Sequence, residues 1–153
     1  MEVIALGCDH AAYGLKENIK EYLTGLGYEV RDYGTDSAKS VDYPDYGIVV
    51  GEAVSRGACD RGIVICGTGI GISISANKVK GIRAAACSDL FSARLSREHN
   101  DSNVLALGAR IVAPEYARSI VKEWLDASFE GGKHVRRILK IARYESGDPD
   151  WKQ

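Results

Sequence analysis

The stretch from Gly62 to Gly71 constrains the fold of this chain more than any other. Gly62 to Cys66 is short and apolar, as expected for a strand that other elements cover on both faces. Glycines at positions 67, 69 and 71 follow at once, and residues 70–78 are predicted to form a helix. A buried strand that leads through a glycine-rich turn into a helix is typical of an α/β protein with a parallel sheet.

The rest of the chain repeats this alternation from end to end. Strands are predicted at residues 3–8, 29–33, 62–66, 82–87 and 104–107. Helices are predicted at residues 15–26, 43–57, 70–78, 89–97, 114–127 and 133–144, with Ser88 as the N-cap of the fourth. Right-handed crossovers then give a three-layer, Rossmann-like α/β fold with a five-stranded parallel sheet and an extra C-terminal helix. We expect a single domain over residues 1–153, with a frayed tail at residues 146–153.

The composition excludes several classes of function. A formal net charge of −1 gives no reason to expect nucleic acid or an anionic membrane as a partner. No apolar run reaches the length of a membrane span, and no signal-peptide pattern precedes the first strand, so a cytoplasmic enzyme is expected. The four cysteines lack Cys-x-x-Cys or zinc-finger spacing, and the three histidines are scattered at positions 10, 99 and 134. We therefore expect reduced, mostly buried thiols and no metal site.

Chemically versatile residues cluster at the predicted carboxyl ends of the strands, where ligands bind in such folds. Asp9 and His10 follow the first strand, Cys66 ends the third, and Arg110 follows the fifth. A helix N-terminus favours the thiolate form of a cysteine, so Cys66 is a candidate nucleophile or base. The alternative is a small buried side chain that merely ends a strand.

The glycine run Gly67-Thr68-Gly69-Ile70-Gly71 admits two functional interpretations. Its backbone N–H groups can cradle an anionic ligand, because glycines let oxygen atoms approach the backbone closely. It also resembles a dinucleotide-binding fingerprint, with Asp89 as a ribose-binding acid, although Ile72 occupies the position of the last fingerprint glycine. A tight turn without a ligand is the structural alternative.

Two further features lie outside the strand ends. His99 follows the fourth predicted helix beside Asn100, and an imidazole can transfer protons near neutral pH, although a surface histidine has the same pattern. On the last predicted helix, Lys133, Arg137 and Lys140 lie one turn apart, opposite an apolar stripe. Two such cations can hold one phosphate group between them, although an ordinary solvated basic face looks alike.

Taken together, these residues resemble the ribose-5-phosphate isomerase B family, within a wider group that includes galactose-6-phosphate isomerase subunits. The resemblance runs from about residue 1 to residue 145 and depends on a set of ordered markers. These markers are Gly7-Cys8-Asp9-His10, Asp42-Tyr43-Pro44, Ile65-Cys66-Gly67-Thr68-Gly69, Ala76-Asn77 within residues 74–78, Ser96-Arg97-Glu98-His99-Asn100 and Gly131-Gly132-Lys133-His134. Each marker is weak alone, whereas their order over the whole length is specific.

The resemblance implies an aldose–ketose isomerase that needs no metal or cofactor. It places the carbon-acid base at Cys66, which would move a proton between C2 and C1 of D-ribose 5-phosphate and D-ribulose 5-phosphate through a cis-enediolate. It assigns the opening of the furanose ring to His99. The other residues that it implies are sugar and enediolate contacts at Asp9, His10, Gly67, Thr68, Gly69, Ile70, Gly71 and Asn100, and phosphate contacts at Arg110, Lys133 and Arg137.

The resemblance leaves substrate size and assembly open. Lys133 stands where the family more often has arginine, so phosphate binding is expected to persist without the planar guanidinium fork. Members of the family are homodimers or homotetramers with sites shared between subunits, so His99, Asn100 or Arg110 can meet Cys66 across an interface. A six-carbon substrate such as allose 6-phosphate or galactose 6-phosphate is an alternative. A non-catalytic nucleotide-binding module is a more distant one.

Overall fold

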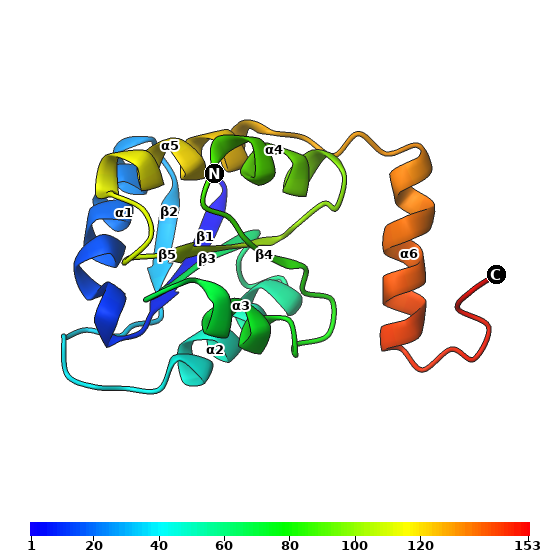
Figure 1. The fold of residues 1–153 in the computed structure, drawn as a ribbon, viewed down its shortest axis with the longest axis horizontal. Helices are drawn as coiled ribbons and strands as arrows, with labels where there is room; N and C mark the ends of the chain where they lie inside the picture. The colour runs from blue at the N-terminus through cyan, green and yellow to red at the C-terminus, as the bar shows by residue number, and fades with distance from the viewer.

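The computed structural model covers residues 1–153 and contains one sheet of five parallel strands (Figure 1). The strands are β1 (Val3–Cys8), β2 (Glu29–Asp32), β3 (Arg61–Cys66), β4 (Ala84–Ala86) and β5 (Val104–Gly108). They lie in the order β2-β1-β3-β5-β4. The chain adds β2 on one side of β1 and then crosses to add β3 on the other side, so the strand order reverses between β1 and β3. The carboxyl ends of these two strands therefore flank a switch point, where ligands bind in open α/β sheets.

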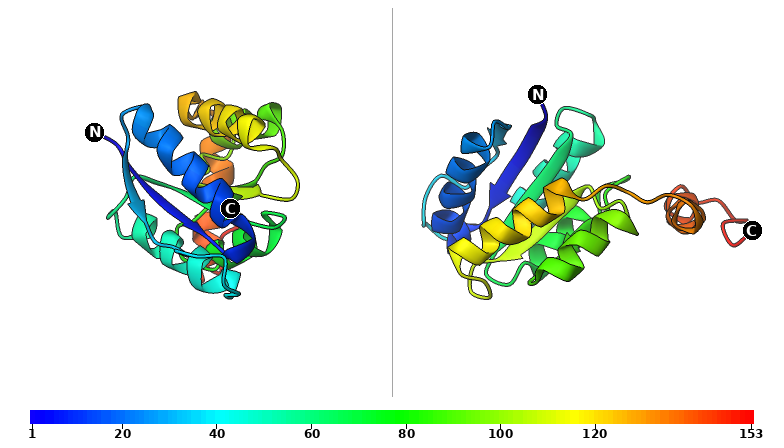
Figure 2. Two further views of the ribbon diagram at one scale, coloured as in Figure 1. Left: turned by 90° about the vertical axis from the view of Figure 1, so that its left-hand side faces the viewer. Right: turned by 90° about the horizontal axis from the view of Figure 1, so that it is seen from above.

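Helices cover both faces of the sheet, as Figures 1 and 2 show. One face carries α1 (Tyr13–Gly25), α4 (Leu90–Glu98) and α5 (Pro114–Asp126), and the other carries α2 (Tyr43–Ser55) and α3 (Ile70–Ala76). This arrangement confirms the predicted three-layer, Rossmann-like fold. None of the helices is both long and apolar enough to cross a membrane.

Side chains of the central strands alternate between two apolar clusters, one on each face of the sheet. In β3, Ile63 and Ile65 join the cluster that includes α1 and α5, whereas Val64 and Cys66 join the cluster that includes α2 and α3. All four side chains are buried, which explains why residues 62–66 form an apolar run in the sequence. Cys66 therefore ends its strand on the side of the sheet that α3 covers.

The bounds of several elements differ from the predictions. The fourth strand is Ala84–Ala86 and not 82–87, because it lies at the edge of the sheet and pairs with β5 alone. The N-cap of α4 is Asp89 and not Ser88, since the Asp89 carboxylate accepts a hydrogen bond of 2.8 Å from the amide of Ser92. A short 3₁₀ helix, η1 (His10–Ala12), precedes α1, and three residues carry no period from which it could be predicted.

The last helix, α6 (Lys133–Glu145), stands apart from the three layers on the β4 side of the molecule (Figures 1 and 2). Its one buried side chain is His134. The exposed apolar residues of this helix are Val135, Leu139, Ile141 and Tyr144. The apolar stripe that the sequence predicts for α6 is therefore largely uncovered within one chain.

Residues 146–153, for which the sequence predicts a frayed tail, turn back against α6. Trp151 packs edge-on against Tyr144 with ring centroids 5.2 Å apart. The guanidinium group of Arg143 donates a hydrogen bond of 2.6 Å to Asp148 and another of 3.0 Å to the carbonyl of Gln153. These contacts hold the end of the chain along the helix that precedes it.

A buried lysine ties the loop after β2 to α1. Lys16 is 2% exposed, and its ammonium group donates hydrogen bonds of 2.8–3.0 Å to both carboxylate oxygens of Asp32 and to the carbonyl of Thr35. Asp32 also accepts a hydrogen bond of 2.9 Å from the amide of Gly34. Burial acts to raise the pKa of Asp32, but the hydrogen bonds from Lys16 and Lys20 outweigh it and lower that pKa below its usual value.

Replacing Lys16 by methionine is expected to lower the free energy of unfolding at pH 7 by about 3 kcal/mol, because it leaves the Asp32 carboxylate without its buried partner. Lys20→Met is the matched control. Lys20 bonds to the same carboxylate but is 39% exposed, so its loss should cost less than about 1 kcal/mol. Urea unfolding of the two variants measures the difference, and equal losses would contradict the role of burial.

The pH dependence of this stabilisation follows from the direction of the Asp32 pKa shift. The folded-state pKa lies below the unfolded value, so the stabilisation is fully present above about pH 4 and is lost as the pH falls through the folded-state pKa. The difference between wild type and Lys16→Met should therefore shrink in strong acid.

Candidate active site

The thiol of Cys66 lies at the carboxyl end of β3, directly before the glycine-rich turn that starts α3. Its sulfur accepts a hydrogen bond of 3.1 Å from the backbone amide of Gly69, and the residue is 4% exposed. Gly69 has a φ of 78°, and a Cβ there would lie 2.9 Å from the carbonyl carbon of Leu107. Only glycine fits this position. The turn thus holds an N–H donor against the sulfur.

Other amides of the same turn are available to a ligand. The N–H groups of Gly67, Thr68 and Gly71 donate no hydrogen bond within the chain, whereas that of Ile70 donates to the hydroxyl of Thr68 (3.2 Å). A cleft of about 300 Å³ opens beside them, and its lining residues are Thr68, Ile70, Ala86, Cys87, Ser88, Gly108 and Ile111. Unpaired amides beside a cleft can stabilise negative charge that develops on a bound oxygen.

The remaining cysteines are suited to structural roles. Cys8, Cys59 and Cys87 are buried and free, as predicted. Burial raises the pKa of Cys8 to about 12 and also raises the pKa of Cys87, so both remain protonated thiols near neutral pH. Cys66 is the one cysteine whose sulfur accepts a hydrogen bond from the amide of a turn that starts a helix.

Asp9 and His10 lie across the switch point from the glycine-rich turn. The amide of Asp9 donates a hydrogen bond of 3.1 Å to the carbonyl of Ile65, which joins the end of β1 to the end of β3. The Asp9 carboxylate caps η1, and the Nδ1 atom of His10 lies 3.1 Å from both the backbone N and O of Val41. The loop of residues 34–42 therefore holds His10 at the carboxyl edge of the sheet.

Arg110 lies against the same turn. A Cβ at Gly67 would lie 3.3 Å from Nη1 of Arg110, and the amide of Arg110 donates a hydrogen bond of 3.0 Å to the carbonyl of Gly67. The structure thus brings many of the predicted site residues together on one chain. We call them the carboxyl-edge set, which consists of Asp9, His10, Cys66, residues 67–71 and Arg110.

Tyr43 also belongs to this edge, although the sequence indicates it only as the start of a helix and as part of a marker. A Cβ at Gly71 would lie 2.8 Å from the ring of Tyr43, so the aromatic ring covers the end of the glycine-rich turn. The residue is 42% exposed, and its ring is therefore accessible to a ligand. The marker Asp42-Tyr43-Pro44 is the one signal in the sequence that points to it.

His99 and Asn100 lie at the opposite edge of the sheet. α4 runs antiparallel to the strands, so the chain that follows it returns to their amino ends, where the carbonyl of Asn103 accepts a hydrogen bond of 2.9 Å from the amide of Gly62. Cys66 lies at the other end of β3, about 13 Å further along the strand. One chain therefore does not bring His99 and Cys66 together.

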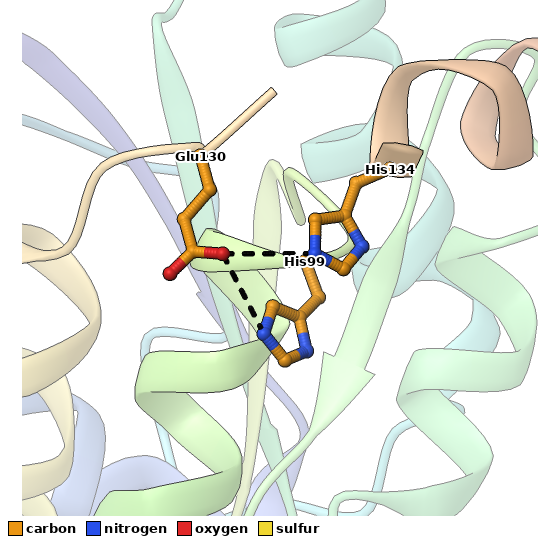
Figure 3. A group of neighbouring side chains, drawn as sticks. All are labelled: His99, Glu130 and His134. Atoms are coloured by element: carbon orange, nitrogen blue, oxygen red, sulfur yellow. Dashed lines mark ion pairs between the residues drawn. The ribbon is translucent and has the colours of Figure 1, made fainter. Parts of the chain in front are cut away.

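The side chain of His99 stacks on that of His134, which lies in the first turn of α6 (Figure 3). The ring centroids are 4.3 Å apart and the rings are 13° from parallel. The Oε2 atom of Glu130 lies 3.8 Å from Nε2 of His99 and 3.6 Å from Nε2 of His134. The histidines look unrelated in the sequence, but the fold assembles two of them with a carboxylate.

The phosphate-binding candidates of α6 flank this stack. Lys133 and Arg137 are both exposed on the same helix as His134. Burial, together with positive charge on His99, Lys133 and Arg137, lowers the pKa of His134. We call His99, Asn100, Lys133 and Arg137 the amino-edge set. Its concentration of positive charge is suited to an anionic group such as phosphate.

Comparison with known proteins places this arrangement in a family. The sequence matches the family model described as Ribose/Galactose Isomerase over residues 4–141. The chain belongs to the ribose/galactose isomerase family. It is 52% identical to ribose-5-phosphate isomerase B of Escherichia coli (strain K12), over 95% of this chain and 97% of that protein. It is 48% identical to D-erythrulose-4-phosphate isomerase of Pectobacterium atrosepticum, over 93% and 94% of the two chains.

A solved structure agrees with this membership of the ribose/galactose isomerase family. Ribose-5-phosphate isomerase B of Clostridium thermocellum superposes with a TM-score of 0.94 at 56% identity, covering 95% of this chain and 98% of that one. The family predicted from the ordered markers is thereby confirmed, and the chain is an isomerase. The nucleotide-binding alternative is set aside. Its ribose-binding candidate, Asp89, already accepts hydrogen bonds from the amide (2.8 Å) and hydroxyl (2.7 Å) of Ser92.

Proposed function

We propose that the chain interconverts D-ribose 5-phosphate and D-ribulose 5-phosphate through a cis-enediolate, with Cys66 as the base. The thiolate takes the proton from C2 of the open-chain aldose while negative charge develops on the oxygen of C1. The proton returns at C1, and the hydroxyl proton of O2 moves to O1, which leaves the carbonyl group at C2. No atom or electron is gained or lost overall, so the reaction needs no redox cofactor.

The contact between Cys66 and the glycine-rich turn is the observation that carries this proposal. The Sγ atom accepts the Gly69 amide at 3.1 Å, and the unpaired amides of Gly67, Thr68 and Gly71 lie in the same turn. One turn can therefore stabilise the thiolate before the proton transfer and the enediolate oxygen after it. Fixed backbone donors are effective here because they need no reorganisation during the reaction.

We propose further that a second copy of the chain completes each site, in a homodimer or a homotetramer. The base lies in the carboxyl-edge set, whereas the histidine that opens the ring and two phosphate-binding cations lie in the amino-edge set. A two-fold axis can place the amino-edge set of one copy against the carboxyl-edge set of the other, and symmetry then builds two equivalent sites. His99 would protonate the ring oxygen as the furanose opens, and Asn100 would contact the sugar.

The uncovered side of α6 supports this assembly. Helix α6 stands apart from the three layers of its chain (Figure 1), and its exposed apolar side chains are Val135, Leu139, Ile141 and Tyr144. Packing these side chains against a second copy would remove apolar surface from water. The same packing would fix the positions of the cations on α6, and phosphate binding by these cations depends on those positions.

Substrate length is tested by a coupled assay on four-, five- and six-carbon aldose phosphates. We expect kcat/KM for D-ribose 5-phosphate to exceed the values for D-erythrose 4-phosphate, allose 6-phosphate and galactose 6-phosphate by about 10-fold or more, because each carbon changes the distance between the phosphate and the reacting centre. A higher value for another sugar would overturn the choice of substrate but leave the isomerase chemistry intact. Turnover of none of the four would overturn both.

A further inference from the structure

The cluster of His99, Glu130 and His134 has a geometry that phosphate binding does not explain. Both Nε2 atoms face the same carboxylate oxygen, Oε2 of Glu130, at 3.8 and 3.6 Å (Figure 3). The three ligand atoms all lie within 4.8 Å of one another. A phosphate group would be repelled by this carboxylate, whereas a cation would be attracted to it.

Backbone contacts fix the three side chains from two separate parts of the chain. The amide of Glu130 donates a hydrogen bond of 3.0 Å to the carbonyl of Glu98, which ties the segment before α6 to the end of α4 next to His99. His134 lies four residues after Glu130, in the first turn of α6, and its side chain is only 8% exposed. Both Nε2 atoms face the Glu130 carboxylate, but the rings are stacked and only 13° from parallel, so a shared ion requires the more exposed His99 ring to rotate about its Cβ–Cγ bond.

The two nitrogen–oxygen separations, 3.8 and 3.6 Å, are close to those of a tetrahedral metal site. Zinc binds histidine nitrogen and carboxylate oxygen at about 2.0–2.2 Å, so two ligands of a tetrahedral site lie about 3.3–3.6 Å apart. The two nitrogen–oxygen separations need to shorten by only a few tenths of an ångström. Glu130 and His99 are 54% and 39% exposed, so solvent can supply the fourth ligand.

The chemistry of the ligands selects the class of ion. Two imidazoles and one carboxylate suit Zn²⁺ and neighbouring transition metals, whereas Mg²⁺ and Ca²⁺ prefer sites made only of oxygen. The positive charges of Lys133 and Arg137 repel every cation, so only an ion that these three ligands bind strongly is retained.

We propose that His99, Glu130 and His134 bind one divalent transition-metal ion of the Zn²⁺ type, and that this ion inhibits the enzyme. A ring nitrogen of His99 that is bonded to a metal cannot transfer a proton to the furanose oxygen. The site is thus inhibitory, and the isomerisation itself uses no metal. The inhibition depends on the function proposed above for His99, whereas the binding of the ion does not.

Titration with Co²⁺ tests the site directly, because tetrahedral Co²⁺ absorbs visible light far more strongly than the hydrated ion. After treatment with a chelator and its removal, the wild-type protein should bind one Co²⁺ per chain, and excess Zn²⁺ should displace it. Glu130→Ala should weaken Co²⁺ binding by 10-fold or more. The Glu130 side chain is half exposed, so its removal should leave the fold intact. Glu98→Gln, which removes the carboxylate next to His99 on the helix side, should bind as the wild type does.

Isomerase assays with Zn²⁺ complete the test, with each variant compared to its own rate without metal. Zn²⁺ should inhibit the wild type and Glu98→Gln at similar concentrations, and Glu130→Ala only at concentrations 10-fold or more higher. Equal inhibition of all three would place the ion elsewhere, with the Cys66 thiol as the obvious site, and would overturn the proposal. Absence of the Co²⁺ band at millimolar metal would overturn it too. That spectrum can be read even if the chain does not isomerise ribose 5-phosphate.

Discussion

Replacing Cys66 by alanine is expected to lower kcat for D-ribose 5-phosphate by about 10²–10⁴-fold, because the variant has no group that can take the proton from C2. Binding should persist, because the amides of residues 67–71 and the cations of both sets are unchanged. Isothermal calorimetry with the sugar phosphate and a coupled rate assay measure the two effects separately. Loss of turnover with retained binding is the signature of a group that acts in the transition state.

Cys59→Ala provides a closely matched control. Cys59 and Cys66 are 3% and 4% exposed, and both belong to the apolar cluster on the α2 and α3 side of the sheet. Removing either sulfur should therefore cost a similar amount of stability, on the order of 1 kcal/mol. Only Cys66 accepts an amide of the glycine-rich turn, so only its replacement should stop turnover.

Cys66→Ser separates the acidity of the thiol from its shape. The serine hydroxyl can still accept the Gly69 amide, but it is far too weak an acid to provide an anionic base near neutral pH. We expect its kcat to fall nearly as far as that of Cys66→Ala. Turnover near the wild-type rate in either variant would contradict the assignment of Cys66 as the base.

The fold was predictable because burial on both faces leaves a strong pattern in a parallel sheet. Residues 62–66 of β3 are apolar and buried, and its neighbours β1 and β5 are buried over most of their length. The predictions were least accurate where burial is incomplete. β4 has no fully buried residue and pairs along one side only, so its length could not be judged from apolar residues.

The two halves of the site were not equally predictable. The carboxyl-edge set follows from a general rule, since each of its members ends a strand or follows one within five residues, and the strand ends meet at one edge. The stack of His99 on His134 has no such rule, because it joins the end of α4 to the start of α6 across 35 residues of sequence. The sequence alone also does not show that Cys66 and His99 lie at opposite ends of β3.

Subunit sharing makes a second prediction with a large effect, which concerns heterodimers of inactive variants. Cys66→Ala and His99→Ala should each be inactive alone. When they are co-expressed with different affinity tags and the mixed dimer is isolated, about half of the wild-type activity per dimer should return. One composite site then takes Cys66 from one chain and His99 from the other, and the second site carries both defects.

A control pairs two defects from the same set. Cys66→Ala with Asp9→Ala leaves every composite site with one altered residue of the carboxyl-edge set, so the mixed dimer should remain inactive. Recovery in this pair would show that the activity comes from reassortment into wild-type chains or from contamination. The comparison also removes any effect of the tags, because both mixtures carry the same ones.

The sharpest discrimination comes from wild type paired with a chain that carries both Cys66→Ala and His99→Ala. If each site were built from one chain, this mixed dimer would keep one intact site and about half of the activity. If the sites are shared, each of them lacks either the base or the histidine that opens the ring, and the dimer should be inactive. The two arrangements thus predict opposite results from the same four residues. The separation of His99 from Cys66 by the length of β3 favours the second result.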